Sequence, residues 1–216
     1  MKQFVTDRNR FLVEFVRGKA VLDVGCVDHS ADSRARGHWL HDAIRKSAER
    51  TVGLDYEPEE VKRLQAEGYD VVCADATAFD LADKFDVVLA GEVMEHLGCP
   101  AGFLNCVRRH LRLGGQLVTS TPNALCINYF VQNLLRGREL DNPDHVGLYS
   151  TTTMSALLRR HGFEPQRVLF YPELRSEWSG GLGQRVSFLL RQGTQLIAAP
   201  VRPSLCHHFI MVSRPV

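Results

Sequence analysis

The feature that most constrains the fold is a short apolar run near the N-terminus, AVLDVGC at residues 20–26. Runs of about four to eight apolar residues bounded by turn signals are typical of buried strands. A strand that is apolar on both sides favours a parallel sheet covered by helices on both faces. Ligands of such sheets bind beyond the carboxyl ends of the strands, so Asp23 and Gly25 are the first candidates for chemistry.

Four further runs continue this pattern along the chain. We expect strands at residues 51–55, 70–74, 85–90 and 116–120, alternating with helices over 4–17 and 37–49 and helices that begin near Pro58 and at Pro100. This alternation predicts parallel β-α units and a doubly wound sheet. Beyond it we expect a helix over 124–136, a helix capped by Ser150, a strand at 166–171, a helix near 184–198 and a last strand at 208–212.

Each of the four later strands ends in a polar or acidic residue or is followed by one within two residues. These residues are Asp55, Asp75, Glu92 and Thr121. The carboxyl ends of parallel strands meet at one edge of the sheet, where carboxylates repel one another. Stability alone therefore explains these residues poorly, and a ligand that carries hydroxyl groups and a positive charge explains them better.

Net charge and cysteine spacing argue against a nucleic-acid-binding protein and against a cysteine-based metal site. The formal net charge of the 216 residues is +1, which gives no electrostatic footprint for a nucleic-acid partner. None of the six cysteines forms a C-x-x-C pair, so we expect no metal site, and their scatter favours a reducing compartment. We expect a cytoplasmic protein, because we find no apolar run of about 18 residues and no signal peptide.

The ordered motifs resemble the class I S-adenosylmethionine-dependent methyltransferases. The resemblance covers residues 18–121 and is closest to the small-molecule enzymes with an E-x-x-E-H-L motif. The matching stretches, in order, are VLDVGC at 21–26, VGLD at 52–55, ADA at 74–76, FDVVLAGEVMEHL at 85–97 and LRLGGQL at 111–117. Each motif alone is weak, but five in the correct order are a strong signal.

The resemblance implies an α/β fold, Rossmann-like and doubly wound. Its mostly parallel seven-stranded sheet has an antiparallel last strand and helices on both faces. We expect one methyltransferase domain over 1–216. It would comprise an N-terminal helix in 1–19, a cofactor-binding core over 18–121, and a substrate-side lid with C-terminal strands over 122–216.

The resemblance also implies the cofactor, S-adenosylmethionine, with S-adenosylhomocysteine as product. Gly25 would let the backbone approach its methionine part, and Asp55 would accept hydrogen bonds from both ribose hydroxyls. Asp75 would lie beside the adenine, Glu92 beside the sulfonium end, and Asp23 would reach the ammonium group through water. The full set of expected cofactor-binding residues is Asp23, Gly25, His29, Asp55, Tyr56, Asp75, Ala76 and Glu92.

One departure affects the first loop. The family pattern after the first strand is G-x-G-x-G, but Val27 and His29 occupy the second and third glycine positions here. Either the loop takes a variant shape, with His29 lining the cofactor pocket, or cofactor binding is weakened. Purely structural roles are the alternative to cofactor binding for these acids, since Asp55 and Glu92 can cap helices and Asp23 can anchor a turn.

Two histidines are candidates for the base that removes a proton from the acceptor. His145 lies in a Pro143-Asp144-His145-Val146 stretch similar to one found over the active site of related methyltransferases, and His96 follows Glu95 in the E-x-x-E-H-L motif. Packing roles are the alternative for both. The acceptor pocket is expected from 124–150 and 171–183, with apolar walls from Tyr129, Phe130, Tyr149, Tyr171 and Trp178.

We therefore expect a monomeric or homodimeric enzyme that methylates a hydroxyl or amine of a small molecule, with no nucleic-acid or membrane partner. A non-catalytic, methyltransferase-like module that binds the cofactor or a partner is the main alternative. A nicotinamide oxidoreductase would need G-x-G-x-x-G after the first strand, which is absent. Neutral charge weakens an RNA substrate, and no N-P-P-[YF] motif follows the fourth strand.

Overall fold

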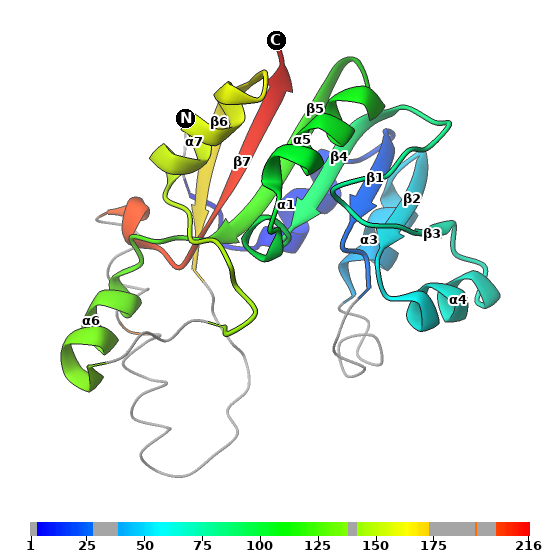
Figure 1. Cartoon of the computed structure of the whole chain (residues 1–216). Coiled ribbons are helices and arrows are strands. Elements are labelled where there is room, and N and C mark those ends of the chain that lie inside the picture. The colour runs from blue at the N-terminus through cyan, green and yellow to red at the C-terminus, as the bar shows by residue number, and fades with distance from the viewer. Residues whose placement is uncertain (1–3, 28–38, 138–141, 173–192, 194–201) are drawn as a thin grey trace.

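The computed structural model describes residues 4–27, 39–137, 142–172, 193 and 202–216 (Figure 1). His29, Trp178 and the helix expected near 184–198 lie outside these residues. Among the described residues, no helix is both long enough and apolar enough to cross a membrane.

Seven strands form one sheet in the order β3-β2-β1-β4-β5-β7-β6. β1 to β5 pair in parallel, whereas β7 lies antiparallel between β5 and β6, which confirms the expected fold class. The strands are β1 (Ala20–Val24), β2 (Arg50–Asp55), β3 (Val71–Cys73), β4 (Phe85–Gly91), β5 (Leu111–Pro122), β6 (Phe163–Tyr171) and β7 (His208–Pro215).

Helices cover both faces of the sheet because alternate strand residues point to opposite sides. Val87 and Leu89 of β4 pack with α1 and α3, whereas Val88 and Ala90 pack with α5 and α7. The helices are α1 (Arg8–Phe15), α3 (Leu40–Ser47), α4 (Pro58–Ala66), α5 (Pro100–His110), α6 (Ile127–Arg136) and α7 (Thr151–Arg160), with short 3-10 turns η1 (Met94–His96) and η2 (Pro203–Leu205).

The end of α5 differs from the sequence expectation, which placed it at Gly114-Gly115. The helix ends at His110, and β5 begins at the next residue. The buried ring of His110 donates from Nδ1 to the Cys106 carbonyl (2.7 Å) and accepts at Nε2 from the Leu81 amide (2.8 Å). Leu111 is already extended and pairs with Phe85 of β4, so the helix cannot continue past His110, and Arg112 then lies in β5, paired with Asp86 at 3.0 Å.

Two leucines allow a test of where the core lies. Leu104 of α5 is fully buried, whereas Leu113 is fully exposed in β5. We expect Leu104→Ala to lower the free energy of unfolding by about 2–5 kcal/mol, because it removes buried methyl groups and leaves a cavity. Leu113→Ala should change it by less than about 0.5 kcal/mol. Equal values in denaturant unfolding would contradict this packing.

Candidate functional site

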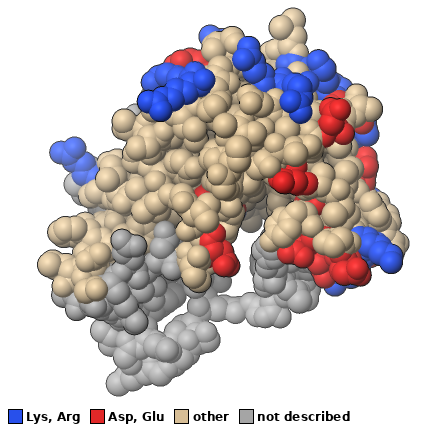
Figure 2. Space-filling model, in the orientation of Figure 1, with Lys and Arg blue, Asp and Glu red and all other residues tan. Residues whose placement is uncertain are grey.

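The carboxyl ends of β1, β2, β4 and β5 meet at one edge of the sheet (Figure 1). The parallel register places Val24 beside Leu54 and Ala90, and Gly91 beside Ser120. On the face drawn in Figure 2, acidic side chains gather at the lower right, where Figure 1 shows α4, whereas most Lys and Arg lie toward the upper edge. The carboxyl ends of the strands lie at the edge where ligands of doubly wound folds bind.

Gly25 turns the chain immediately after β1. Its φ is +73°, a left-handed conformation that glycine adopts without steric cost. Its amide donates to the Leu54 carbonyl at 2.8 Å, and a Cβ atom at this position would lie 2.7 Å from Cγ2 of Val93. The backbone conformation and the contact with Val93 therefore both require glycine at this position, and the residue is exposed at the end of β1.

Asp55 ends β2 and is 4% exposed. Its Oδ2 accepts from the Val27 amide at 2.9 Å, and its Oδ1 accepts from the Glu57 amide at 3.3 Å. A carboxylate offers about four acceptor positions, so Asp55 retains capacity for further donors. Tyr56, the next residue, is 66% exposed beside it.

Val27 shows how the first loop accommodates one missing glycine. Its side chain is buried with Trp39, Val61 and Val71, while its amide binds Asp55. The extra side chain therefore packs into the protein at this position. The second departure, His29, lies outside the described residues.

Asp75 and Ala76 follow β3. The exposed Asp75 carboxylate accepts at Oδ1 from both the amide (2.7 Å) and the hydroxyl (2.8 Å) of Thr77. These hydrogen bonds hold its pKa below the usual aspartate value. Its orientation is thereby fixed beside the end of β2, and Ala76 is half-buried next to it.

Asp23, the acid inside β1, has a partner within the protein. Its Oδ2 lies 2.8 Å from Nδ1 of His41, and both side chains are buried. His41, which sequence reasoning missed, also contacts the rings of Trp39 and Tyr69. A direct bond from Asp23 to a ligand would compete with this pair, so its predicted contact through water remains a prediction.

Glu92 holds a left-handed backbone at the end of β4, with φ of +58°, which is unusual for a residue other than glycine. Its Oε1 accepts from the Tyr171 hydroxyl at 2.8 Å, and its Oε2 lies 3.2 Å from Nε2 of His208. Burial acts to raise the pKa of Glu92, but His208, Arg8 and Tyr171 together hold it well below the usual range. The Glu92 carboxylate, which we expected to lie beside the sulfonium, is therefore already engaged by partners within the protein.

Arg8 of α1 is a second residue that sequence reasoning missed. Burial alone would lower its pKa, but the nearby Tyr171, Glu92, Asp23 and Glu95 outweigh burial and raise it. Its guanidinium passes so close to Gly91 that a Cβ atom there would overlap it. The signal was present in the sequence, because Arg8 is spaced four residues from both Phe4 and Leu12 and falls within the apolar stripe of its helix.

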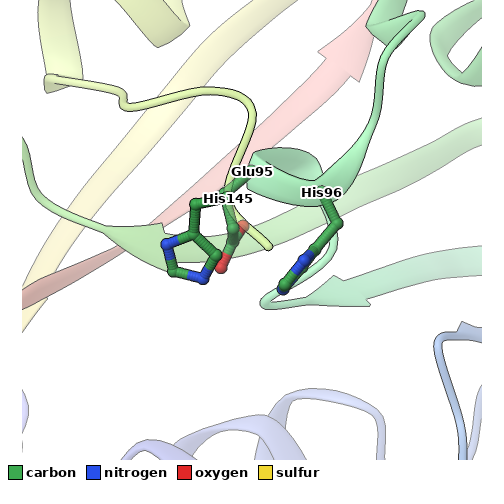
Figure 3. A group of neighbouring side chains, drawn as sticks. All are labelled: Glu95, His96 and His145. Carbon is green, nitrogen blue, oxygen red and sulfur yellow. The ribbon is translucent and has the colours of Figure 1, made fainter. Parts of the chain in front are cut away.

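Glu95, His96 and His145 form a second group beside these acids. Each offers a potential ligand atom, and the three atoms lie within 4.8 Å of one another. Figure 3 shows the Glu95 carboxylate between the two imidazoles, which come from η1 and from the segment before α7. The imidazole centroids are 4.7 Å apart, with their planes nearly perpendicular. The structure thus brings together the two histidines expected to act on the acceptor.

Backbone hydrogen bonds hold this group in place. The amides of Val146 and Gly147 donate to the Glu95 carbonyl at 2.8 and 3.0 Å, and Nδ1 of His96 lies 3.2 Å from the Asp144 carbonyl. Burial and the neighbouring Glu92 carboxylate raise the pKa of Glu95 to about 8. The chain segment 142–147 is therefore fixed against η1 at the carboxyl edge of the sheet.

The walls expected for an acceptor pocket divide into two sets. Phe130 of α6 is 65% exposed and available for an apolar contact. Tyr171 instead bonds Glu92, and Tyr129 packs against His207 at 5.3 Å between ring centroids. The apolar surface at this end therefore comes from α6 and from Val146 and Leu148, which are exposed.

Comparison with known proteins shows consistent similarity. A family model described as "Methyltransferase domain" matches residues 2–168. The ubiquinone biosynthesis O-methyltransferase of Cereibacter sphaeroides is 36% identical over 202 residues, covering 87% of this chain and 75% of the relative. That of Pseudomonas paraeruginosa is 30% identical over 154 residues, covering 62% of each. The chain spans just over half, 54%, of another curated relative.

Solved structures agree on the fold. A SAM-dependent methyltransferase from Archaeoglobus fulgidus superposes with a TM-score of 0.61 at 18% identity, covering 94% of this chain and 89% of that one. The 1,6-didemethyltoxoflavin-N1-methyltransferase of Burkholderia thailandensis, solved with S-adenosylhomocysteine, gives 0.58 at 17% identity and covers 96% and 78%. At such identities the likeness concerns the fold alone.

The close approach at Gly25 can be tested against a matched glycine. Gly68 also has a positive φ, +84°, but nothing lies within 4 Å of its missing Cβ. We expect both alanine variants to lose about 1 kcal/mol from backbone strain. Gly25→Ala should lose about 1–3 kcal/mol more because its Cβ meets Val93. Equal losses in urea unfolding would contradict the tight turn.

Proposed function

Since the chain belongs to the class I S-adenosylmethionine-dependent methyltransferases, we propose that it methylates a hydroxyl or amine of a small molecule. One observation carries this proposal: the same sheet edge presents Asp55, with spare acceptor capacity, and the imidazole pair of His96 and His145. The first suits a nucleoside, and the second suits an acceptor that must lose a proton.

The residues at the edge fit the cofactor. When bound, S-adenosylmethionine supplies a methyl group already activated on a sulfonium. Asp55 would accept from the ribose hydroxyls, and the backbone of Gly25 would lie against the methionine part. Asp75 and Ala76 would hold the adenine, with Tyr56 beside Asp55.

His96 and His145 would handle the proton of the acceptor. The Asp144 carbonyl can only accept, so Nδ1 of His96 carries the hydrogen and Nε2 keeps a lone pair. A positioned base of this kind contributes about 10²- to 10⁴-fold to the rate. Alignment of the acceptor with the methyl group can remove about 7–11 kcal/mol of the barrier, which makes positioning the larger effect.

A small, partly apolar acceptor suits the surroundings of this pair. The exposed side chains of Leu125, Phe130, Val146 and Leu148 offer apolar surface near the segment that carries His145. The relatives named for ubiquinone biosynthesis O-methylation support an acceptor hydroxyl on a molecule with an apolar part. The net charge of +1 gives no support to a nucleic-acid acceptor.

The alternative of a non-catalytic module depended on the missing glycines of the first loop. The Val27 side chain is buried, and its amide donates to Asp55, so the substitution of this glycine leaves the first loop hydrogen-bonded to Asp55. This weakens the argument for a non-catalytic module. A module without chemistry would also have little need for two imidazoles held against a buried carboxyl.

Calorimetric titration with S-adenosylmethionine and S-adenosylhomocysteine tests the cofactor site. We expect Asp55→Asn to weaken both by at least about tenfold, or about 1.4 kcal/mol, because a charged acceptor of ribose hydroxyls is lost. Asp70→Asn is the matched control, since Asp70 precedes β3 at the opposite edge and pairs with Arg50 at 3.5 Å. Unchanged affinity in Asp55→Asn would contradict a role in cofactor binding and leave Asp55 only its structural hydrogen bonds to Val27 and Glu57.

A further inference from the structure

We propose that Glu95, His96 and His145 form a binding site for one divalent transition-metal ion, with the chemistry of Zn²⁺ or Co²⁺. Cysteine spacing had led us to expect no metal, but these ligands are imidazoles and a carboxylate from distant parts of the chain. The site deepens the proposed function and rests on it: with the ion bound, both imidazole lone pairs serve as ligands, so the ion would take over from the histidines in activating the acceptor hydroxyl, whose proton would pass to solvent.

The separation of the three side chains suits a single ion. Two ligands at about 2.1 Å from one ion lie at most about 4.2 Å apart. The potential ligand atoms already lie within 4.8 Å of one another. The remaining gap is thus at most about 0.6 Å, which small side-chain adjustments close without movement of the backbone.

A buried carboxylate oxygen points to a ligand. Glu95 is 1% exposed, and its Oε2 accepts from the Thr121 hydroxyl at 2.9 Å. Its Oε1 is buried and has no hydrogen-bond partner among the residues that the structure describes. A buried oxygen without a partner costs about 1–3 kcal/mol. Coordination to an ion would satisfy Oε1, while Thr121 holds the other oxygen, as in the outer shell of known metal sites.

The hydrogen bond of His96 prepares it as a ligand. Because Nδ1 donates to the Asp144 carbonyl, the lone pair is on Nε2. Metal-binding histidines commonly donate their second nitrogen to a backbone carbonyl in this way, which fixes the tautomer and the orientation of the ring. The bonds from Val146 and Gly147 to the Glu95 carbonyl then keep His145 beside the same carboxylate.

The ligand set identifies the class of ion. Two imidazoles with one carboxylate bind zinc in catalytic sites and non-haem iron in oxygenases, and imidazole favours both over Mg²⁺ and Ca²⁺. Three protein ligands leave at least one position open. If the proposed function holds, an acceptor oxygen would occupy that position, and the ion would lower the pKa of its hydroxyl.

A competing interpretation is that Glu95 shares a proton with the neighbouring Glu92. Both carboxyls lie in the field of Arg8, and a proton between them would also compensate the buried charge. In that case neither imidazole would have a role at Glu95, and added metal would find no specific site there.

Metal binding can be measured on the full chain after chelation, without cofactor or acceptor. We expect Co²⁺ absorption and Zn²⁺ calorimetry to show one ion per chain, without the intense absorption of cobalt-thiolate bonds. Glu95→Gln and His145→Ala should weaken binding by at least about a hundredfold. His161→Ala, which changes the histidine at the end of α7, is the matched control and should leave affinity unchanged.

Three outcomes would overturn the proposal: no binding, affinity unchanged in both ligand variants, or thiolate absorption that assigns the ion to cysteines. His96→Ala extends the test if Glu95→Gln fails to fold, because His96 is exposed. The same samples titrated with S-adenosylhomocysteine separate the two hypotheses. Loss of metal affinity with intact nucleoside binding concerns the metal site alone, whereas intact metal binding without nucleoside binding contradicts the proposed function.

Discussion

All of the chemistry proposed for this chain depends on the parallel alignment of β1, β2, β4 and β5. Parallel pairing brings four carboxyl ends to one edge, so that residues far apart in sequence face the same ligand. Gly25 and Asp55 meet at the β1 and β2 ends, and Glu92 and Thr121 lie at the β4 and β5 ends. A sheet with antiparallel neighbours at its centre would have divided these residues between opposite edges.

The edge concentrates negative charge, and the protein offsets that charge unevenly. Asp23 pairs with His41, and Glu92 is surrounded by Arg8, Tyr171 and His208. These contacts tie α1, β6 and β7 to the end of β4. Asp55 and Asp75 receive mainly backbone and hydroxyl donors, which orient a carboxylate without cancelling its charge. The charge left at the β2 and β3 ends is therefore available to a ligand.

The strands were predictable because each combines an apolar run with a polar end, and local sequence decides both. The end of α5 was not, because it depends on the pairing of Leu111 with Phe85 of β4, a contact between residues distant in sequence. Sequence order also predicted Asp55 and the pair of His96 and His145 as candidates, and the structure places the two imidazoles side by side while their roles stay predictions. It could not show that Glu92 is occupied by Tyr171 or that Glu95 is the buried carboxyl between the imidazoles, since the tertiary packing of β4, β6 and β7 determines which acid points inward.

The most direct test of the central claim is a crystal structure of the chain with bound S-adenosylhomocysteine. We predict that the ribose hydroxyls lie within hydrogen-bonding distance of the Asp55 carboxylate and that the sulfur is directed toward Glu95, His96 and His145. Nucleoside density elsewhere on the molecule, or a sulfur directed away from these three side chains, would contradict the assignment of this edge as the methyl-transfer site.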